Sequence, residues 1–470
     1  MLEFHKKKPK NPSKTEPEKR IKDFQEIYSQ FDKNDSVEQS SRCSQCGIPY
    51  CQIHCPLNNN IPDWLRYIAE GRLEEAYQVS ASTNAFPEVC GRVCPQDRLC
   101  EGNCVVEQAG FGAITIGNLE KYLTEIAWEK GWVKNLSSQN QFKQKVAIIG
   151  SGPAGMAASA YLTQNGYQVD VFEKNDRAGG LMIYGIPNFK LDKKIVERRT
   201  EWLLESGVKF NLNMEVGKNI SFQDLEKDYD AILIATGVYK ARKLDIDTSS
   251  VENSIPALDF LIESNRTGLG DSPSNNKFLT AKDKNVVVIG GGDTAMDCVR
   301  TAIRQQAKEV TCLYRRNKEN MPGSAREVLN AEQEGIKFNW LSVPSKIISD
   351  NSTATSMTYK VAALGEVDES GRRKPVDTGV EKQIKSDLII QALGFEPEDL
   401  NHNFKTNIEL TSWKTVKVDF KKFQTSNPKI FAAGDIVRGA SLVVWAIHDG
   451  REVAKSIHNF LQSSKIKKAS

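Results

Sequence analysis

The order of apolar and polar residues divides most of the chain into two differently built parts. After residue 144, short apolar runs lead into glycine-rich turns and helix-like runs, a pattern that predicts parallel strands alternating with helices. Between residues 41 and 135, apolar side chains recur at helical spacing over Ile61–Val79 and Gly117–Trp128, which predicts a mostly helical domain. The polar stretch Val133–Lys143 follows neither period and is expected to link the two parts.

A polar arm precedes the helical domain. Residues 1–40 contain several prolines and one predicted helix at Glu18–Phe31, and they form either a surface arm or a docking surface for a partner. Charges nearly balance over the whole chain, with a net charge of +3, which argues against a nucleic-acid-binding protein. No apolar run is long enough to span a membrane and the first residues lack a signal-peptide core, so a cytoplasmic protein is expected.

The first α/β stretch contains the fingerprint of a dinucleotide site. The apolar run Val146–Ile149 leads into a G-x-G-x-x-G turn, and Tyr167–Phe172 predicts a second strand that ends at Glu173. The candidate binding residues of the turn are Gly150, Gly152, Pro153, Ala154 and Gly155. Glycines in this pattern permit a tight turn, close approach to a pyrophosphate and close helix–strand packing, while Glu173 is placed to accept hydrogen bonds from a ribose.

The same fingerprint occurs a second time, with a different end to its second strand. Lys284–Gly292 predicts another strand and turn, whose candidate binding residues are Gly290, Gly292, Asp293, Thr294 and Ala295. The following strand, Val310–Tyr314, ends in Arg315 and Arg316 where the first unit has an acid. Guanidinium groups suit the 2′-phosphate of NADPH, so this unit is assigned to NADPH and the first unit to FAD. The alternative is that both arginines are ordinary surface charges.

The flavin domain is expected to be split in sequence. Asp230–Thr236 predicts another buried strand, and Lys429–Gly439 predicts a strand before a helix-like run at Leu442–Phe460. Further candidate flavin contacts are Gly180, Leu181, Thr236, Gly237, Gly434 and Asp435, the last as partner of a ribityl hydroxyl. The predicted fold class is therefore α/β: a mostly helical cysteine domain at 41–135 is followed by two Rossmann-like domains, and the NADPH domain at 281–393 is inserted between flavin-domain parts at 144–280 and 394–470.

Eight of the ten cysteines lie in two short groups within the helical domain. These are Cys43, Cys46, Cys51 and Cys55, followed by Cys90, Cys94, Cys100 and Cys104. Thiolates at such spacings hold iron–sulfur clusters or zinc. The prolines after Cys55 and Cys94 and the flavin fingerprint downstream favour two 4Fe–4S clusters over two zinc sites.

Together these motifs resemble the small (β) subunit of bacterial NADPH-dependent glutamate synthase over nearly the full chain. The stretches that carry the resemblance are Cys43–Pro56, Pro87–Cys104, Gly112–Glu120, Tyr184–Lys193, Gly290–Thr301, Tyr314–Ser324 and Gln424–Val444. The resemblance implies an oxidoreductase subunit in which NADPH reduces FAD and electrons leave through two 4Fe–4S clusters. It also implies a hetero-oligomer with a large (α) subunit that makes glutamate from glutamine and 2-oxoglutarate. No catalytic acid, base or nucleophile is then expected in this chain.

The resemblance further implies how the cysteines share the clusters. One cluster would be held by Cys43, Cys46, Cys51 and Cys104, and the other by Cys55, Cys94, Cys100 and a fourth ligand, either Cys90 or Glu120. Two positions depart from the family's pattern. Trp445 replaces a usually small residue, a change that bears on flavin exposure, and Ala325 replaces a common arginine, a change that bears on NADPH binding.

Other functions fit the same motifs. The same electron-input module occurs in proteins that resemble dihydropyrimidine dehydrogenase and ferredoxin–NADP transhydrogenases, which share the cofactors and deliver electrons elsewhere. The N-terminal run Glu18–Tyr28 favours glutamate synthase. A non-catalytic redox-sensing or assembly subunit is another alternative, but the intact Glu173, Arg315, Arg316 and cysteines argue against it.

Overall fold

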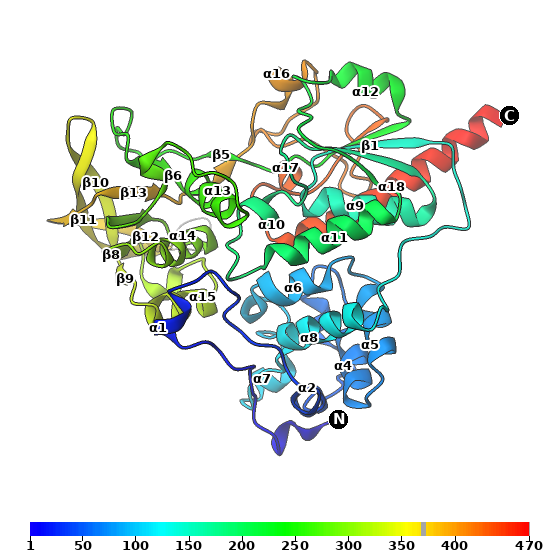
Figure 1. The fold of residues 1–470 in the computed structure, drawn as a ribbon, viewed down its shortest axis with the longest axis horizontal. Helices are drawn as coiled ribbons and strands as arrows, with labels where there is room; N and C mark the ends of the chain where they lie inside the picture. Colours follow the sequence, from blue (N-terminus) through cyan, green and yellow to red (C-terminus); the bar gives the residue numbers. More distant parts are fainter. Residues whose placement is uncertain (368–372, 470) are drawn as a thin grey trace.

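The computed structural model describes residues 1–367 and 373–469, and it divides them among a helical domain and two α/β units (Figure 1). The helical domain carries both cysteine groups and lies below the two units in this view. Its helices are α2 (Lys33–Ser41), α3 (Tyr50–Ile53), α4 (Ile61–Ala69), α5 (Leu73–Ala81), α6 (Pro87–Val93), the short 3₁₀ helix η2 (Gln96–Arg98), α7 (Val105–Gln108) and α8 (Ile116–Glu129). Among the residues described, none of the helices has the length and apolarity needed to cross a membrane.

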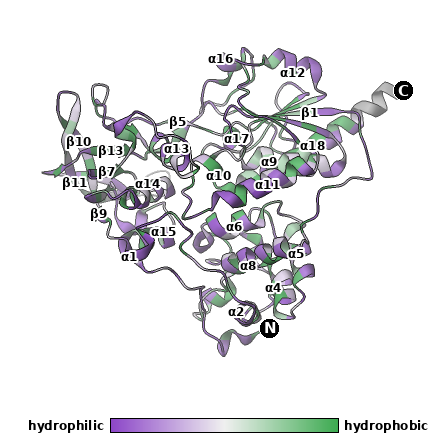
Figure 2. Ribbon diagram, in the orientation of Figure 1, coloured by the Kyte–Doolittle hydropathy of each residue, from purple (hydrophilic) through white to green (hydrophobic). Residues whose placement is uncertain are grey.

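The first α/β unit is built on a five-stranded parallel sheet. In spatial order its strands are β15 (Ile430–Ala432), β4 (Ala231–Ile234), β1 (Lys145–Ile149), β2 (Gln168–Phe172) and β3 (Lys209–Asn211). The unit also contains α9 (Pro153–Asn165), α10 (Leu181–Tyr184), α11 (Lys193–Glu205), α12 (Phe222–Asp228), α16 (Leu400–Phe404), α17 (Asp435–Arg438) and α18 (Val443–Ala469). The central strands are buried and coloured as hydrophobic in Figure 2, as parallel strands covered on both faces are expected to be. Because β15 comes from the end of the chain, this unit is split in sequence, as predicted.

The second α/β unit repeats this architecture within an insertion. Its parallel sheet has the order β6 (Ser254–Pro256), β13 (Leu388–Gln391), β7 (Asn285–Ile289), β8 (Glu309–Leu313) and β9 (Lys337–Asn339). Its helical elements are α13 (Ala257–Gly268), η3 (Lys277–Leu279), α14 (Asp293–Arg304), η4 (Lys318–Asn320) and α15 (Ala325–Gln333). The sequence analysis placed the start of this unit at residue 281, but the unit begins earlier, with β6 at Ser254. The three-residue β6, which ends in a proline, is too short to give a strand signal.

The two connections between the α/β units run side by side. The outgoing strand β5 (Lys240–Ala241) pairs antiparallel with the returning strand β14 (Phe395–Glu396). A separate antiparallel sheet of β10 (Ser342–Asp350), β11 (Thr353–Val367) and β12 (Arg373–Lys385) extends from the second unit, at the left of Figure 1. The sequence analysis did not predict this sheet, and β12 is almost wholly exposed, so it lacks the buried apolar alternation that would have marked it.

Two helix predictions in the first part of the chain are wrong. The expected helix at Ile61–Val79 is two helices, α4 and α5, because the chain turns at Gly71 with a φ of +75°. The expected helix at Glu18–Phe31 is reduced to the single turn α1 (Pro17–Arg20), preceded by the short 3₁₀ helix η1 (Glu3–His5) near the N-terminus. Between α1 and α2 the chain forms turns and irregular backbone, and its side chains pair with other domains instead of forming a helical face.

The arm crosses all three parts of the molecule. Figure 1 shows α1 beside α15 of the second unit, away from the helical domain that follows it in sequence. Arg20 is buried there, with its Nε 2.8 Å from Glu334 Oε1. Farther along the arm, Glu26 pairs with Arg92 and Lys121 of the helical domain at 2.5 and 2.6 Å. The interpretation of residues 1–40 as a surface arm therefore needs correction, since part of the segment is buried between domains.

Glu334 is the centre of a buried ionic cluster. Besides Arg20, it pairs with Arg300 at 2.9 Å and Arg304 at 2.8 Å, and its own side chain is fully buried. Both of these guanidinium groups also lie over the ring of Phe189 from the first unit, at 4.5 and 4.0 Å from its centroid. Burial alone would raise the pKa of Glu334, but hydrogen bonds from Arg304 and Arg300 outweigh it and lower the pKa to about 2.

Removing this carboxylate is expected to destabilise the second unit strongly. In a Glu334→Gln variant three buried guanidinium groups lose their shared counter-charge, which costs about 3–5 kcal/mol of unfolding free energy. Glu332→Gln is the matched control, since Glu332 forms a partly exposed pair with Lys318 and its loss costs about 1 kcal/mol or less. Urea unfolding measures both, and equal midpoints for the two variants would contradict this account.

The pH dependence of the same cluster has a definite sign. Because the pKa of Glu334 falls from 4.5 to about 2 on folding, its stabilising contribution is complete above about pH 4.5 and is lost as the pH falls towards 2. The Glu334→Gln variant is expected to lack this part of the acid sensitivity.

Candidate functional site

Each α/β unit places its glycine-rich loop at the carboxyl end of its central strands. Gly150 follows β1 with a φ of +102°, and a Cβ on it would lie 2.5 Å from the carbonyl oxygen of Ala235, just after β4. Gly290 follows β7 with a φ of +147°, and a Cβ there would lie 2.2 Å from the carbonyl oxygen of Ala392, just after β13. Both positions therefore require glycine, and the two loops occupy equivalent places in their sheets.

Both loops leave room for a ligand at their second glycine. A Cβ at Gly152 or Gly292 would meet no atom within 4 Å, so a ligand can approach the backbone closely there. Helix α9 begins directly afterwards at Pro153, and α14 begins at Asp293. Each open position thus lies at the positive end of a helix dipole, which suits a pyrophosphate.

A cavity of about 770 Å³ joins the two loops, and we call it the junction cavity. Its walls come from both α/β units and from Val93, Pro95, Arg98 and Leu99 of the helical domain. The predicted site residues that line it are Gly150, Gly152, Pro153, Ala154, Glu173, Leu181, Thr236, Gly237, Gly292, Asp293, Thr294, Gly434 and Asp435. The volume is in the range of cofactor sites in proteins.

Several predicted site residues support the loops without lining the cavity. A Cβ at Gly155 would lie 2.1 Å from the carbonyl oxygen of Gly150, so this glycine permits the close approach of α9 to its loop. Gly180 packs in the same way, since its Cβ would lie 2.7 Å from the Cα of Gly152. Gly290 makes the tight turn after β7, and Ala295 is fully buried in α14.

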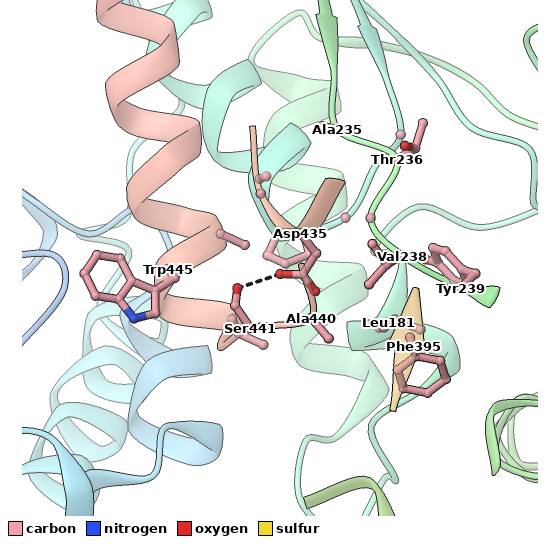
Figure 3. Close-up of a pocket in the computed structure, with 18 of the residues that line it drawn as sticks. Leu181, Ala235, Thr236, Val238, Tyr239, Phe395, Asp435, Ala440, Ser441 and Trp445 are labelled. Atoms are coloured by element: carbon pink, nitrogen blue, oxygen red, sulfur yellow. Dashed lines mark hydrogen bonds between the residues drawn. The ribbon is translucent and has the colours of Figure 1, made fainter. Parts of the chain in front are cut away.

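The first half of the cavity fits FAD. The hydroxyl oxygen of Thr236 is buried and has no hydrogen-bond partner among the described residues, so it is available to a bound group. Asp435 lies opposite at the start of α17 and accepts a hydrogen bond of 2.6 Å from Ser441 Oγ, as Figure 3 shows. Burial raises the pKa of Asp435. Helix α18 begins nearby, and its Val443 and Ala446 line the same wall.

Glu173 lies at the end of β2, where a ribose acceptor is expected. Its Oε2 accepts hydrogen bonds from the backbone N and the hydroxyl of Ser151, at 3.0 and 2.6 Å. Its Oε1 accepts from the backbone N and side-chain amide of Asn175, at 2.9 and 2.8 Å. These four hydrogen bonds fix the carboxylate between β2 and the glycine loop, in the wall of the junction cavity.

The two predicted arginines of the NADPH unit point to different places. Arg315, two residues after the end of β8, is exposed. Arg316 is 4% exposed, and its Nε donates a 2.7 Å hydrogen bond to the carbonyl oxygen of Arg373 on β12. The structure therefore separates the pair into one exposed and one buried arginine. Neither arginine lines the junction cavity.

Some residues at the cavity were not found from the sequence. Lys190 of the first unit forms a 2.8 Å buried ion pair with Asp297 of α14, and both line the cavity. Burial raises the pKa of Asp297 to about 6, although Lys190 opposes this shift. Lys190, Arg98 and Leu99 all lie within stretches that carried the family resemblance, but Arg98 and Leu99 belong to the helical domain and reach the cavity from there. Contacts between domains leave no periodicity in a sequence.

Trp445 and Ala325, the two departures, have different surroundings. Trp445 lines the cavity at the start of α18, and the guanidinium of Arg438 lies 4.6 Å from its ring centroid. Ala325 begins α15 outside the cavity, and its backbone N donates to Asp97 at 3.1 Å. Their effects on flavin exposure and NADPH binding stay predictions.

Three cysteines of the second group and one of the first line a small cavity. Its lining includes Cys55, Cys90, Cys94, Cys100 and Glu120, and it is otherwise mainly apolar. Burial raises the pKa of Cys55 to about 11 and that of Glu120 to about 8. A carboxylate buried without a cation is costly, and the hydrogen bond to Glu120 from Asn84 is long at 3.4 Å. The donor set of soft thiolates around an enclosed space fits an iron–sulfur cluster.

The remaining cysteines form another group nearer the surface. Burial raises the pKa of Cys51 to about 12, with further contributions from the charges of Cys43 and Cys104. Cys43 and Cys104 are buried, whereas Cys46 and Cys51 are partly exposed. Within the described residues, no three metal-binding side chains converge as they do around a single ion. A four-iron cluster is bound at its corners, so its ligands stand farther apart.

Comparison with known proteins defines the class first. Residues 144–450 match the family described as pyridine nucleotide-disulphide oxidoreductase, and residues 20–132 match the one described as dihydropyrimidine dehydrogenase domain II, 4Fe-4S cluster. The fold is similar to that of FprA from Mycobacterium tuberculosis in complex with NADPH, with a TM-score of 0.58, 19% identity, and coverage of 69% of this chain and 86% of that one. The chain is thus a pyridine nucleotide oxidoreductase fused to a 4Fe–4S domain.

Closer relatives define the family. The chain is 51% identical to the glutamate synthase [NADPH] small chain of Azospirillum brasilense, over 98% of this chain and 97% of the relative. It is 45% identical to the protein of the same name in Escherichia coli, over 97% and 96% of the two chains. The chain belongs to the family of NADPH glutamate synthase small chains, and the predicted fold class, FAD, NADPH and 4Fe–4S chemistry are confirmed.

Proposed function

We propose that this chain is the electron-input subunit of glutamate synthase, which takes electrons from NADPH and passes them to a large subunit that makes glutamate from glutamine and 2-oxoglutarate. The observation that carries the proposal is the junction cavity, because one space touches both glycine loops and the cysteine domain. When bound, FAD supplies the change from hydride transfer to single-electron transfer. The chain's own task is to hold the two dinucleotides and exclude water between them.

Particular residues are proposed to hold each cofactor. The turn at Gly150 and the start of α9 would bind the FAD pyrophosphate, Glu173 its ribose, and Thr236 and Asp435 other polar groups of the flavin. The turn at Gly290 and the start of α14 would bind the pyrophosphate of NADPH.

The two cysteine groups are proposed to hold two 4Fe–4S clusters in sequence. Leu99 lines both the junction cavity and the cavity around Cys94 and Cys100, so the inner cluster would lie next to the flavin. The outer cluster, with Cys46 and Cys51, would then deliver electrons to the large subunit.

The surface at the outer group supports this exit. The loop after Cys46 and the helix α3, which contains Cys51, expose three large apolar side chains: Ile48 at 63%, Tyr50 at 43% and Ile53 at 57%. Apolar residues at the surface are typical of protein–protein contacts. The cytoplasm is the proposed compartment, since the reaction draws on NADPH and metabolic amino acids.

Mixing the protein with NADPH without oxygen tests the input half of the proposal. The flavin absorbance is expected to bleach within the mixing experiment, and the protein should then reduce an artificial acceptor. An oxidised flavin that persists in excess NADPH would contradict the proposed function.

Arg315 provides a test of nucleotide preference. In an Arg315→Ala variant the KM for NADPH is expected to rise about tenfold or more, because a charge-assisted hydrogen bond to the 2′-phosphate is lost. The KM for NADH should stay unchanged, since NADH lacks this phosphate. Steady-state kinetics with both nucleotides measures the effect, and an equal rise for both would show that Arg315 does not read the 2′-phosphate.

A further inference from the structure

The cysteine domain reaches into the nucleotide loop of the second α/β unit. Arg98, at the end of η2, borders the junction cavity, and its Nη1 donates a 2.7 Å hydrogen bond to the carbonyl oxygen of Pro322. Its Nη2 lies 3.5 Å from Asp293 Oδ2, in the first turn of α14. A cation from one domain thus stands at the open end of the proposed NADPH loop in another.

The charges around this loop require such a cation. In the first loop the residue after the second glycine is Pro153, whereas in the second loop it is Asp293, whose Oδ1 accepts a 3.0 Å hydrogen bond from the backbone N of Ser324. A negative charge in the first turn of α14 opposes the binding of an anion there. Lys190 also borders the cavity, but it is engaged in a buried ion pair with Asp297 at 2.8 Å. Arg98 is the remaining arginine or lysine of the cavity lining that contacts this loop.

The geometry leaves Arg98 able to bind a ligand. Its side chain is 45% exposed, and the 3.5 Å distance to Asp293 is too long for a close charge-assisted hydrogen bond. Beside it, Gly292 has open space where a side chain would otherwise stand. A planar guanidinium presents several donors at once and suits a diphosphate.

We propose that Arg98 binds the pyrophosphate of NADPH, so that the nucleotide site is completed by the iron–sulfur domain. This inference rests on the proposed assignment of NADPH to the second loop. It separates two parts of recognition: Arg98 reads the diphosphate that NADPH and NADH share, while Arg315 reads the 2′-phosphate that they do not share.

Direct binding of oxidised nucleotides to the flavin-loaded protein tests the proposal without turnover. Calorimetry with NADP⁺ and NAD⁺, together with competition by adenosine 2′-monophosphate, gives the affinity of each variant for all three ligands. Arg98→Ala is expected to weaken the binding of NADP⁺ and of NAD⁺ by about tenfold or more each. Its affinity for adenosine 2′-monophosphate should be unchanged. The nucleotide affinity of Arg98→Lys should lie between those of Arg98→Ala and the parent protein, because lysine keeps the positive charge but lacks the planar guanidinium with its several donors.

Two control variants separate direct binding from domain placement. Arg66→Ala removes an equally exposed arginine, 43% exposed, from the same domain and should change no affinity. Asp97→Asn weakens the neighbouring contact to Ser324 Oγ and the backbone N of Ala325 while keeping Arg98. If Asp97→Asn weakens NADP⁺ binding as much as Arg98→Ala does, Arg98 acts by placing the domain and not by binding the nucleotide, and the proposal is overturned.

The remaining outcomes are equally decisive. An unchanged affinity of Arg98→Ala for NADP⁺, in a preparation whose parent binds it, overturns the role of Arg98 and leaves the proposed function intact. Loss of adenosine 2′-monophosphate binding as well would show a disturbed unit and also overturn the direct contact. A parent protein that binds no NADP⁺ would instead overturn the assignment of the second loop.

Discussion

A Gly150→Ala variant is expected to be purified largely without FAD, whereas Gly290→Ala should keep its FAD and respond poorly to NADPH. At each position a Cβ would collide with a backbone carbonyl oxygen, at 2.5 Å from Ala235 and 2.2 Å from Ala392, and φ lies in the region that favours glycine. Strain of about 1–3 kcal/mol in either loop is enough to shift its pyrophosphate position and weaken binding about tenfold or more.

The pair of variants tests which loop serves which dinucleotide. The flavin-to-protein absorbance ratio reports FAD, and the KM for NADPH reports the second loop in the flavin-loaded protein. Gly268→Ala is the matched control, because a Cβ there meets no atom within 4 Å and both measurements should be unchanged. Loss of flavin from Gly290→Ala, with Gly150→Ala keeping it, would reverse the assignment.

A Glu120→Leu variant is expected to lose half of the bound iron, while Cys90→Ser keeps all of it. Both residues line the inner cysteine cavity, so both are candidates for the fourth ligand. We propose Glu120, because its partly buried carboxylate has no ion pair among the described residues, and burial raises its pKa to about 8. Coordination to iron would supply the missing positive partner.

Iron, acid-labile sulfide and electron paramagnetic resonance of the reduced protein measure the outcome. In Glu120→Leu the flavin should still be reduced by NADPH, but electron transfer from it to an acceptor at the outer cluster should fall by about 10–100-fold, the usual cost of losing a group at a metal site. Loss of iron from Cys90→Ser, with none from Glu120→Leu, would assign the cysteine as ligand.

The fold was predictable where local sequence carries a repeated signal. Strands β1 and β7, their glycine turns and the helices after them were predicted, because a buried strand, a tight turn and a helix N-terminus each demand recognisable residues. The helix α8 was predicted from its apolar spacing. By contrast, β6 is too short and β12 too exposed to leave such a signal.

The site was predictable within each domain and unpredictable between domains. Gly150, Gly152, Gly292, Glu173 and Asp435 line one cavity, since each follows a strand end, and their contacts with cofactors stay predictions. Arg316 is directed to β12, a strand the sequence did not reveal, so its role changed. Arg98, Lys190 and the buried part of the arm owe their roles to contacts across domain boundaries, which no local pattern encodes.

The central claim is that electrons enter this chain from NADPH and leave it for a glutamate synthase large subunit. Its most direct test is NADPH oxidation by the chain combined with that subunit, without oxygen, in the presence of glutamine and 2-oxoglutarate, with glutamate measured as product. We predict NADPH consumption that depends on both substrates and on the large subunit, with glutamate formed in proportion. Flavin reduction by NADPH without any glutamate would contradict the claim, because the input half would stand and the proposed partner would be wrong.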